Sequence, residues 1–285
     1  MRRLLSWLVY PGLVASALAA VHVAMARGVP PALVLGGVQV VSVVVIALLE
    51  RWMPEHASWN VARGDVRTDA IYLVVSGLLV TSLIRAAVLG GLPSLGLWPT
   101  RWPLALQVFA AIAIADLPSY LTHLVDHRVP WLWPIHAPHH SAPRLYWLNA
   151  TRMHPLDQGS TVVLSLLPLA LLGAPPATLA LFDAFAIVHL LLQHSNIRLR
   201  QGPLSLVIAT AEFHRWHHSR KREESECNYA SFLSLWDLLF RTFRMPAGES
   251  APEEVGLYEE APFPDGFLGQ LRAPFTAWHA LLRRP

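Results

Sequence analysis

Histidine is the residue type whose spacing in this sequence indicates chemistry. The 285-residue chain has 14 histidines but a single cysteine. Two triplets follow the pattern H-x-x-H-H; one pair precedes the first triplet and another lies between the triplets. These ten are His123, His127, His136, His139, His140, His189, His194, His214, His217 and His218. Neutral imidazoles without thiolates suit iron, zinc, copper or nickel. Their number exceeds the needs of one tetrahedral site and predicts two neighbouring metal ions.

Helical spacing would direct these side chains together. Residues three and four apart share one face of a helix, which applies to His123 and His127 and to each triplet, although Pro138 makes the first triplet less regular. We expect the isolated His22, His56 and His279 to be structural. Acidic residues near the histidines could fix the orientation of the rings by accepting their second N–H. These are Asp116, Asp126, Asp183, Glu212 and Asp237.

The composition indicates a membrane protein. Hydrophobic residues make up 54% of the chain and charged residues only 14%, about half the charged share of a soluble domain. A formal net charge of +3 and the lack of a dense basic arm argue against a nucleic-acid partner. The single cysteine excludes an intrachain disulfide and any site built on several thiolates.

Apolar runs predict an all-α integral membrane protein with about four transmembrane helices and a His-rich helical cap. The expected spans are residues 4–26, 31–49, 70–92 and 104–125. Two shorter runs, 161–173 and 177–193, fit a re-entrant or interfacial hairpin as well as two crossings. The N-terminal run also resembles a signal peptide, but its apolar length favours an uncleaved first span.

Arginine placement predicts the orientation. With a cytoplasmic N-terminus, Arg2, Arg3, Arg51, Arg63 and Arg67 lie inside, and only Arg27 and Arg101 lie outside. The cap and both termini are then cytoplasmic, and we expect a bacterial inner membrane. Arg85, near the end of the third span, is expected to extend toward the membrane surface.

Seven segments carry a resemblance to a known family. They are "DLPSYLTHLVDH" (116–127), "HAPHHSA" (136–142), "NATRMHP" (149–155), "QHSN" (193–196), "EFHRWHHS" (212–219), "NYA" (228–230) and "WDLLFRTF" (236–243). In order and content they resemble the fatty acid hydroxylase / sterol desaturase superfamily. The resemblance implies a non-haem centre of two iron ions, replaceable by zinc, that uses O₂ to hydroxylate or desaturate a lipid. An acyl chain and a sterol- or hopanoid-like lipid are the candidate substrates.

The resemblance also implies roles for individual residues. Nine of the ten histidines match ligand positions, and His189 is an uncertain tenth because Gln193 stands where a paired histidine would fall. Candidates to support the ligands or contact the substrate are Asp116, Asn149, Arg152, His154, Asn228 and Asp237. The chain divides into a transmembrane region (1–103), a catalytic domain (104–245) and an acidic-to-basic tail (246–285).

Partners and rival functions follow from the same features. A separate electron-donor protein is expected, because the sequence has no haem, flavin or nicotinamide fingerprint. The basic run Arg215, Arg220, Lys221 and Arg222 could bind that donor or a lipid headgroup, or could be an ordinary cytoplasmic charge patch. The alternatives are a metal transporter, an inactive scaffold, and a zinc hydrolase with Glu212 as base.

Overall fold

The chain folds into a bundle of long helices with a compact cap at one end. The computed structural model describes residues 2–246, 248–249, 251–258 and 262–282. Within these residues, six helices are long and apolar enough to cross a membrane. They are α1 (Arg2–Ala26), α2 (Pro31–Trp52), a continuous helix formed by α3 (Val66–Tyr72), the π-helical η2 (Leu73–Val80) and α4 (Thr81–Gly91), α5 (Leu104–Arg128), α7 (Pro155–Leu172) and α8 (Pro176–His194). The prediction of an all-α membrane protein is confirmed.

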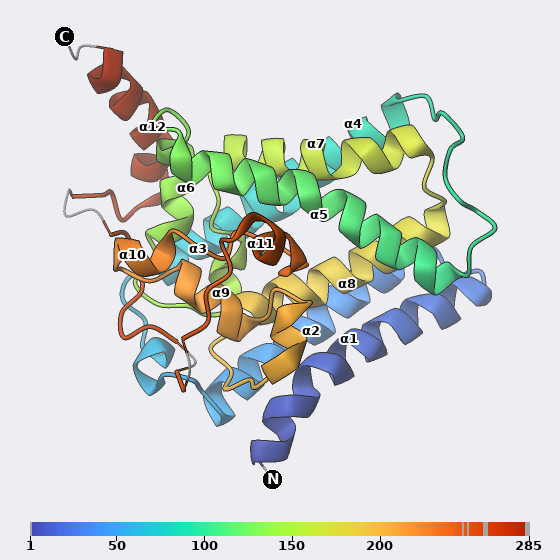
Figure 1. Cartoon of the computed structure of the whole chain (residues 1–285), viewed down its shortest axis with the longest axis horizontal. Coiled ribbons are helices and arrows are strands. Elements are labelled where there is room, and N and C mark those ends of the chain that lie inside the picture. The colour runs from blue at the N-terminus through green and yellow to red at the C-terminus, as the bar shows by residue number, and fades with distance from the viewer. Residues whose placement is uncertain (1, 247, 250, 259–261, 283–285) are drawn as a thin grey trace.

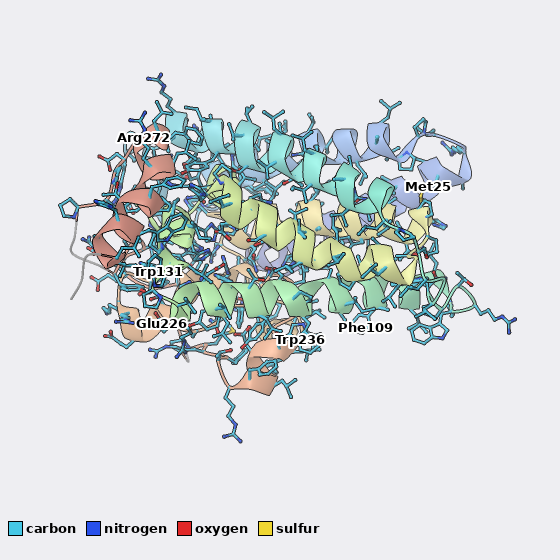
Figure 2. All side chains as sticks on the ribbon, turned by 90° about the horizontal axis from the view of Figure 1, so that it is seen from above. Met25, Phe109, Trp131, Glu226, Trp236 and Arg272 are labelled. Carbon is cyan, nitrogen blue, oxygen red and sulfur yellow. The ribbon has the colours of Figure 1, made fainter. Side chains whose placement is uncertain are left out.

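Short helices build the cap. They are η1 (Ala57–Asn60), α6 (Trp133–His140), η3 (Trp147–Thr151), η4 (Gly202–Leu206), α9 (Ala211–His217), α10 (Arg222–Ser225), α11 (Leu235–Phe240) and α12 (Phe267–Leu282). The connections α1–α2, α4–α5 and α7–α8 lie at the opposite end of the bundle (Figure 1). Figure 2 shows Trp131, Glu226 and Arg272 at the cap end and Met25 at the other. The N-terminus therefore lies at the same end as the histidines.

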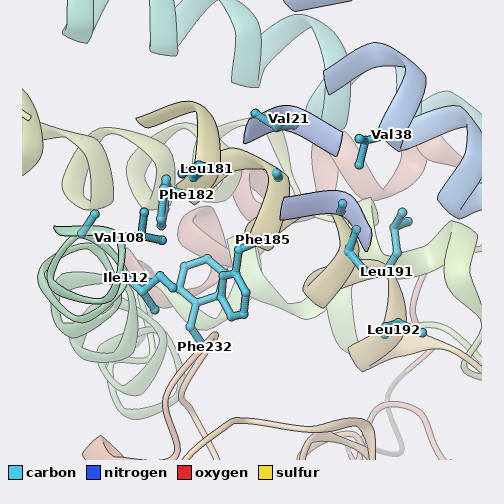
Figure 3. Packing of buried hydrophobic residues seen from close by; sticks show 14 of the residues in the cluster. Val21, Val38, Val108, Ile112, Leu181, Phe182, Phe185, Leu191, Leu192 and Phe232 are labelled. Carbon is cyan, nitrogen blue, oxygen red and sulfur yellow. The ribbon is translucent and has the colours of Figure 1, made fainter. Parts of the chain in front are cut away.

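Helix α8 is the centre of the bundle. Most of its residues are buried, and it packs against α1, α2 and α5. In Figure 3, Phe185 of α8 lies beside Phe232 of the cap and Ile112 of α5; the rings of Phe185 and Phe232 have their centroids 5.7 Å apart. This apolar core joins the cap to the bundle, so cap and helices position the histidines as one unit.

The α7–α8 hairpin is longer than the apolar runs suggested. Helix α7 begins at Pro155, six residues before the expected segment. Proline suits the first turn of a helix. The polar residues that follow it also lie in the helix, although they are not part of the apolar run. The turn is sharp because Gly173 adopts a left-handed conformation (φ 81°) at the end of α7. Both helices of the hairpin are long and apolar enough to cross a membrane, which fits the predicted alternative of two crossings.

The third long helix packs closely on the cap at its π-helical segment, η2. Ser76 Oγ donates a hydrogen bond of 2.6 Å to the carbonyl of Met153. A Cβ atom at Gly77 would lie 2.8 Å from the methyl group of Thr151, so glycine permits this approach. A π-helical bulge changes the local register of the helix, and here it lies against the loop after η3.

Arg85 does not extend toward the membrane surface as expected. Its guanidinium pairs with Asp183 of α8, with N–O distances of 2.6 and 2.8 Å. A charged carboxylate on an apolar helix is stabilised by a nearby cation more than an isolated arginine is by reaching for water. The pair therefore joins α4 to the central helix.

We predict that Arg85→Leu lowers the free energy of unfolding by about 1–3 kcal/mol, a value between those of exposed and fully buried ion pairs. The loss arises because the largely buried carboxyl group of Asp183 is left without its cationic partner. Thermal unfolding in detergent measures it. The double variant Arg85→Leu/Asp183→Leu should regain stability; equal losses in the single and double variants would show that the loss does not come from an unpaired Asp183.

Candidate metal centre

Five of the predicted histidines form one buried group. His123, His127, His136, His140 and His217 each offer a ring nitrogen, and all of these atoms lie within 4.8 Å of one another. They come from the end of α5, from α6 and from α9. The Nε2 atoms of His127 and His140 are 3.1 Å apart. The Nε2 atoms of His123, His136 and His217 are buried without a hydrogen-bond partner.

The other four form a second group. His139, His194, His214 and His218 also converge within 4.8 Å. The Nε2 atom of His194 lies 3.3 Å from that of His139 and 3.2 Å from that of His214, which is 3.0 Å from that of His218. Each Nε2 has one proton or one lone pair and so takes part in one hydrogen bond, which means that the three contacts along this chain of four Nε2 atoms cannot all be hydrogen bonds. Nitrogens bound to a common ion at about 2.1 Å are separated by about 3.0–3.4 Å, which fits the observed spacing.

The two groups adjoin each other. His139 and His140 are consecutive residues of α6 that belong to different groups, and His217 and His218 divide in the same way. The ring centroids of His140 and His218 are 4.7 Å apart. The consecutive pair in each H-x-x-H-H motif thus places one imidazole in each group.

Backbone carbonyls fix the tautomers of several ligands. The Nδ1 of His123 lies 2.7 Å from the carbonyl of Tyr229, and the Nδ1 of His217 lies 2.7 Å from that of Cys227. A carbonyl can only accept, so each Nδ1 carries the proton. The unprotonated Nε2 of each ring then points into the group with a free lone pair, as a metal requires.

His136 is oriented by a carboxylate that sequence reasoning missed. Its Nδ1 donates to Asp157 Oδ2 at 2.9 Å, and Asp126 lies close to the same pair. Burial acts to lower the pKa of His136, but the charge of Asp157 and its hydrogen bond outweigh burial and raise it. The signal in the sequence was a carboxylate in the first turn of the helix that follows "RMHP".

Five other histidines of the cap are held in their neutral form. Burial lowers the pKa of His217 to about 3. Burial, followed by the charges of neighbouring imidazoles, lowers the pKa values of four others well below the usual range: those of His139, His140, His214 and His218. Neutral imidazole is the form that binds metal ions.

Two aspartates hold the segment that supplies the carbonyls. Asp116 of α5 accepts the backbone N–H groups of residues 231, 232 and 233 at 2.6–3.2 Å. Asp237 of α11 accepts those of Tyr229 and Ala230, both at 2.9 Å. Both aspartates are fully buried. They act on the ligands through this segment and do not contact the rings in either group.

Other predicted support residues hold neighbouring segments. Asn228, in a left-handed conformation (φ 58°), donates to the carbonyl of Phe213 beside His214. Arg152 donates to the carbonyl of Pro138 in α6 and to Asp69. Asn149 donates to the carbonyl of Arg144 and closes the turn before η3. None of these three lies in a histidine group.

The N-terminal helices also support the centre, which sequence reasoning missed. Glu50 at the end of α2 accepts the backbone N–H groups of Trp147 and of Asn196, two residues after His194. Asp69 accepts from Tyr146 and Arg152. The signal in the sequence was the acidic residues at the end of the second long helix and after it. A carboxylate that becomes buried requires hydrogen-bond donors from another segment.

Three predicted residues have roles other than those expected. His189 lies outside both groups, because Tyr10 donates to its Nδ1 at 2.6 Å and its Nε2 donates to the carbonyl of Ser231 at 2.8 Å. His154 caps α7 and donates to the carbonyl of Leu271 in α12. Glu212 accepts the backbone N–H of Gln201 and lies outside both histidine groups, so the expected hydrolytic base does not adjoin the centre.

The basic residues in and after the second triplet differ in their surroundings. Arg215 is fully buried and donates to the carbonyls of Ser195 and Ile197. Acidic partners pair with the other cations: Arg220 with Glu254, Lys221 with Glu224 and Arg222 with Glu226. Burial therefore excludes Arg215 from a donor or headgroup site, whereas Arg220, Lys221 and Arg222 are exposed and each lies 3.6–3.7 Å from an acidic side chain.

Comparison with known proteins identifies the family. The model of the fatty acid hydroxylase family matches residues 108–242. Ornithine lipid hydroxylase OlsE of Rhizobium tropici is 35% identical over 246 residues, which cover 82% of this chain and 73% of that protein. The chain belongs to the fatty acid hydroxylase family. Human alkylglycerol monooxygenase is 32% identical over 51% of the chain and 32% of its own length, and human cholesterol 25-hydroxylase is 25% identical over 48% and 51%. No solved structure gives a significant match.

Membership in the fatty acid hydroxylase family agrees with the chemistry of the donor set. The chain is a membrane oxidoreductase, and family members are iron-dependent enzymes that use O₂. Buried, neutral imidazoles with inward lone pairs are suitable ligands for iron. The unpartnered nitrogens of the first group and the converging nitrogens of the second both fit bound metal.

We predict that His189→Gln retains its metal, whereas His194→Ala loses about half of it, because only His194 belongs to a histidine group. Glutamine can keep one hydrogen bond of His189, so the first variant should lose about 1–2 kcal/mol of stability. Metal analysis of the purified variants checks this. Equal metal loss in both would make His189 a ligand.

We predict that Asp157→Asn lowers metal affinity by about 10–100-fold, the usual effect of losing a carboxylate behind a histidine ligand. Competition with a coloured chelator for Zn²⁺ or Co²⁺ gives the ratio. Asp265→Asn, which removes an exposed carboxylate elsewhere in the cap, should leave affinity unchanged. Normal affinity in Asp157→Asn would mean that the ring of His136 needs no such partner.

Proposed function

We propose that this chain is a two-iron hydroxylase that inserts oxygen into a C–H bond of a membrane lipid. The observation that carries the proposal is the division of nine histidines, eight of them buried, into two adjoining groups. His123, His127, His136, His140 and His217 would hold one ion, and His139, His194, His214 and His218 the other. Residues 104–245 form the catalytic part in this proposal, and residues 1–103 support it.

The bound iron would supply O₂ activation. The balanced reaction consumes O₂, two electrons and two protons; one oxygen atom enters the C–H bond and the other leaves as water. The chain itself holds the imidazoles in their neutral form and fixes the tautomers of His123 and His217 through two carbonyls. Burial of the histidines keeps water away from the reacting groups.

The position of the centre supports a lipid substrate. The histidines lie at the ends of α5 and α8, where apolar helices meet the polar cap. A lipid could reach this boundary from the bilayer without leaving it. Since the relatives are named for an ornithine lipid, an alkylglycerol and cholesterol, we propose an acyl-chain lipid and take ornithine lipid as the first substrate to test.

Topology supports a cytoplasmic centre in a bacterial inner membrane. Arg2, Arg3, Arg51, Arg63 and Arg67 lie at the cap end of the helices, and Arg27 and Arg101 lie at the opposite end. Positive charges favour the cytoplasmic side. On that side a separate electron-donor protein could deliver the two electrons to the cap.

We predict that expression of the protein in bacteria that contain ornithine lipids yields lipids heavier by one oxygen atom. Lipids lighter by two hydrogens would instead indicate a desaturase. Lipid mass spectrometry, with metal analysis of the same preparation, distinguishes them. His217→Ala should abolish the product, whereas His279→Ala, which removes an exposed imidazole outside the centre, should not. Product from His217→Ala, or unchanged lipids despite bound iron, would contradict the proposal.

A further inference from the structure

A cationic cavity lies at the cap end of α1, outside the histidine groups. Its volume is 560 Å³, and it is lined by Arg2, Arg3, Ser6, Trp7, Met53, Pro54, Arg198 and Arg200. This size is within the range of small-molecule sites. Four of these residues are arginines, and the described lining contains no acidic side chain.

Most of this positive charge lacks an acidic partner. Arg200 pairs with Glu55 at 2.9 Å. The ion pairs among the described residues include none for Arg2, Arg3 or Arg198. Arg2 lies over the ring of Trp52, with its guanidinium carbon 5.7 Å from the ring centroid. Like charges collected around one cavity repel one another, so an anion bound there would be stabilised.

The walls of the cavity are fixed by contacts between three segments. The backbone N–H of Arg200 donates to the carbonyl of Ser6, and that of Arg198 donates to the carbonyl of Met53, both at 2.8 Å. Trp7 packs so closely on Gly202 that a Cβ atom there would lie 2.8 Å from the indole. These contacts join the segment that carries Arg198 and Arg200 to α1 and to the residues after α2.

The cavity lies where a lipid headgroup would lie. Apolar residues of α1 next to it are exposed, with 63% of Leu4 and 51% of Leu8 accessible. Trp7 and Trp52 are also exposed, and tryptophan favours the membrane interface. A ligand with a phosphate at the arginines could therefore place its acyl chains along α1.

We propose that this cavity binds the phosphate headgroup of an anionic glycerophospholipid. Guanidinium groups bind phosphate by paired hydrogen bonds, and basic pockets between membrane helices bind such headgroups. No histidine of either group lines the cavity, so the bound lipid is separate from the reacting centre. The inference is independent of the proposed reaction.

The test is native mass spectrometry of the full-length protein in detergent, titrated with phosphatidylglycerol, phosphatidylcholine or inorganic phosphate. We expect phosphatidylglycerol to bind more tightly than phosphatidylcholine. The double variant Arg3→Gln/Arg198→Gln should weaken phosphatidylglycerol binding by at least about tenfold, from the usual contribution of two interfacial cations. Arg3→Lys/Arg198→Lys, which keeps the charges and is the less disruptive change, should regain part of the affinity.

The matched control is Arg63→Gln/Arg67→Gln, which removes two exposed arginines at the same end of the bundle. It should bind phosphatidylglycerol as the unchanged protein does. Equal loss in both double variants would overturn the proposal in favour of general surface charge. Competition by inorganic phosphate at the concentration of the lipid would also overturn it, in favour of a site for free phosphate.

Discussion

The structure depends on a constraint on buried imidazoles. A histidine that directs one nitrogen at a metal carries its proton on the other nitrogen, and inside a protein that N–H requires an acceptor. The acceptors are carbonyls of Tyr229 and Cys227 for two rings and the carboxylate of Asp157 for a third. Each acceptor must be fixed as firmly as the ring it serves, because a displaced acceptor would release the tautomer.

That requirement explains how the cap is joined to the bundle. The carbonyls belong to a segment without regular structure, whose backbone N–H groups would otherwise be unsatisfied. Asp116 from the bundle and Asp237 from α11 accept five of these groups between them. Phe232 in the same segment packs on Phe185 of α8. Polar and apolar contacts thus hold one short segment against the membrane helices, and two ligands of the first group, His123 and His217, depend on it.

The N-terminal helices extend this support. Glu50 connects α2 to Asn196, which follows α8, and to Trp147 at the start of η3. Asp69 accepts hydrogen bonds from Tyr146 and Arg152, which flank η3. Polar interactions therefore concentrate at one end of the bundle, whereas the rest of the helical surface is apolar. The cationic cavity at the start of α1 is lined by residues from that same end of the bundle.

The sequence by itself determined the helical membrane class, the family and the set of histidines, because apolar length and H-x-x-H-H spacing are local properties. Only the tertiary structure decided how the rings divide between two groups and that His189 belongs to neither, since its partners Tyr10 and Ser231 are distant in the chain. Asp157, the carbonyl acceptors and the Arg85–Asp183 pair were missed or misjudged for the same reason. A backbone carbonyl has no signature in the sequence, and the partner of a buried charge is chosen by packing.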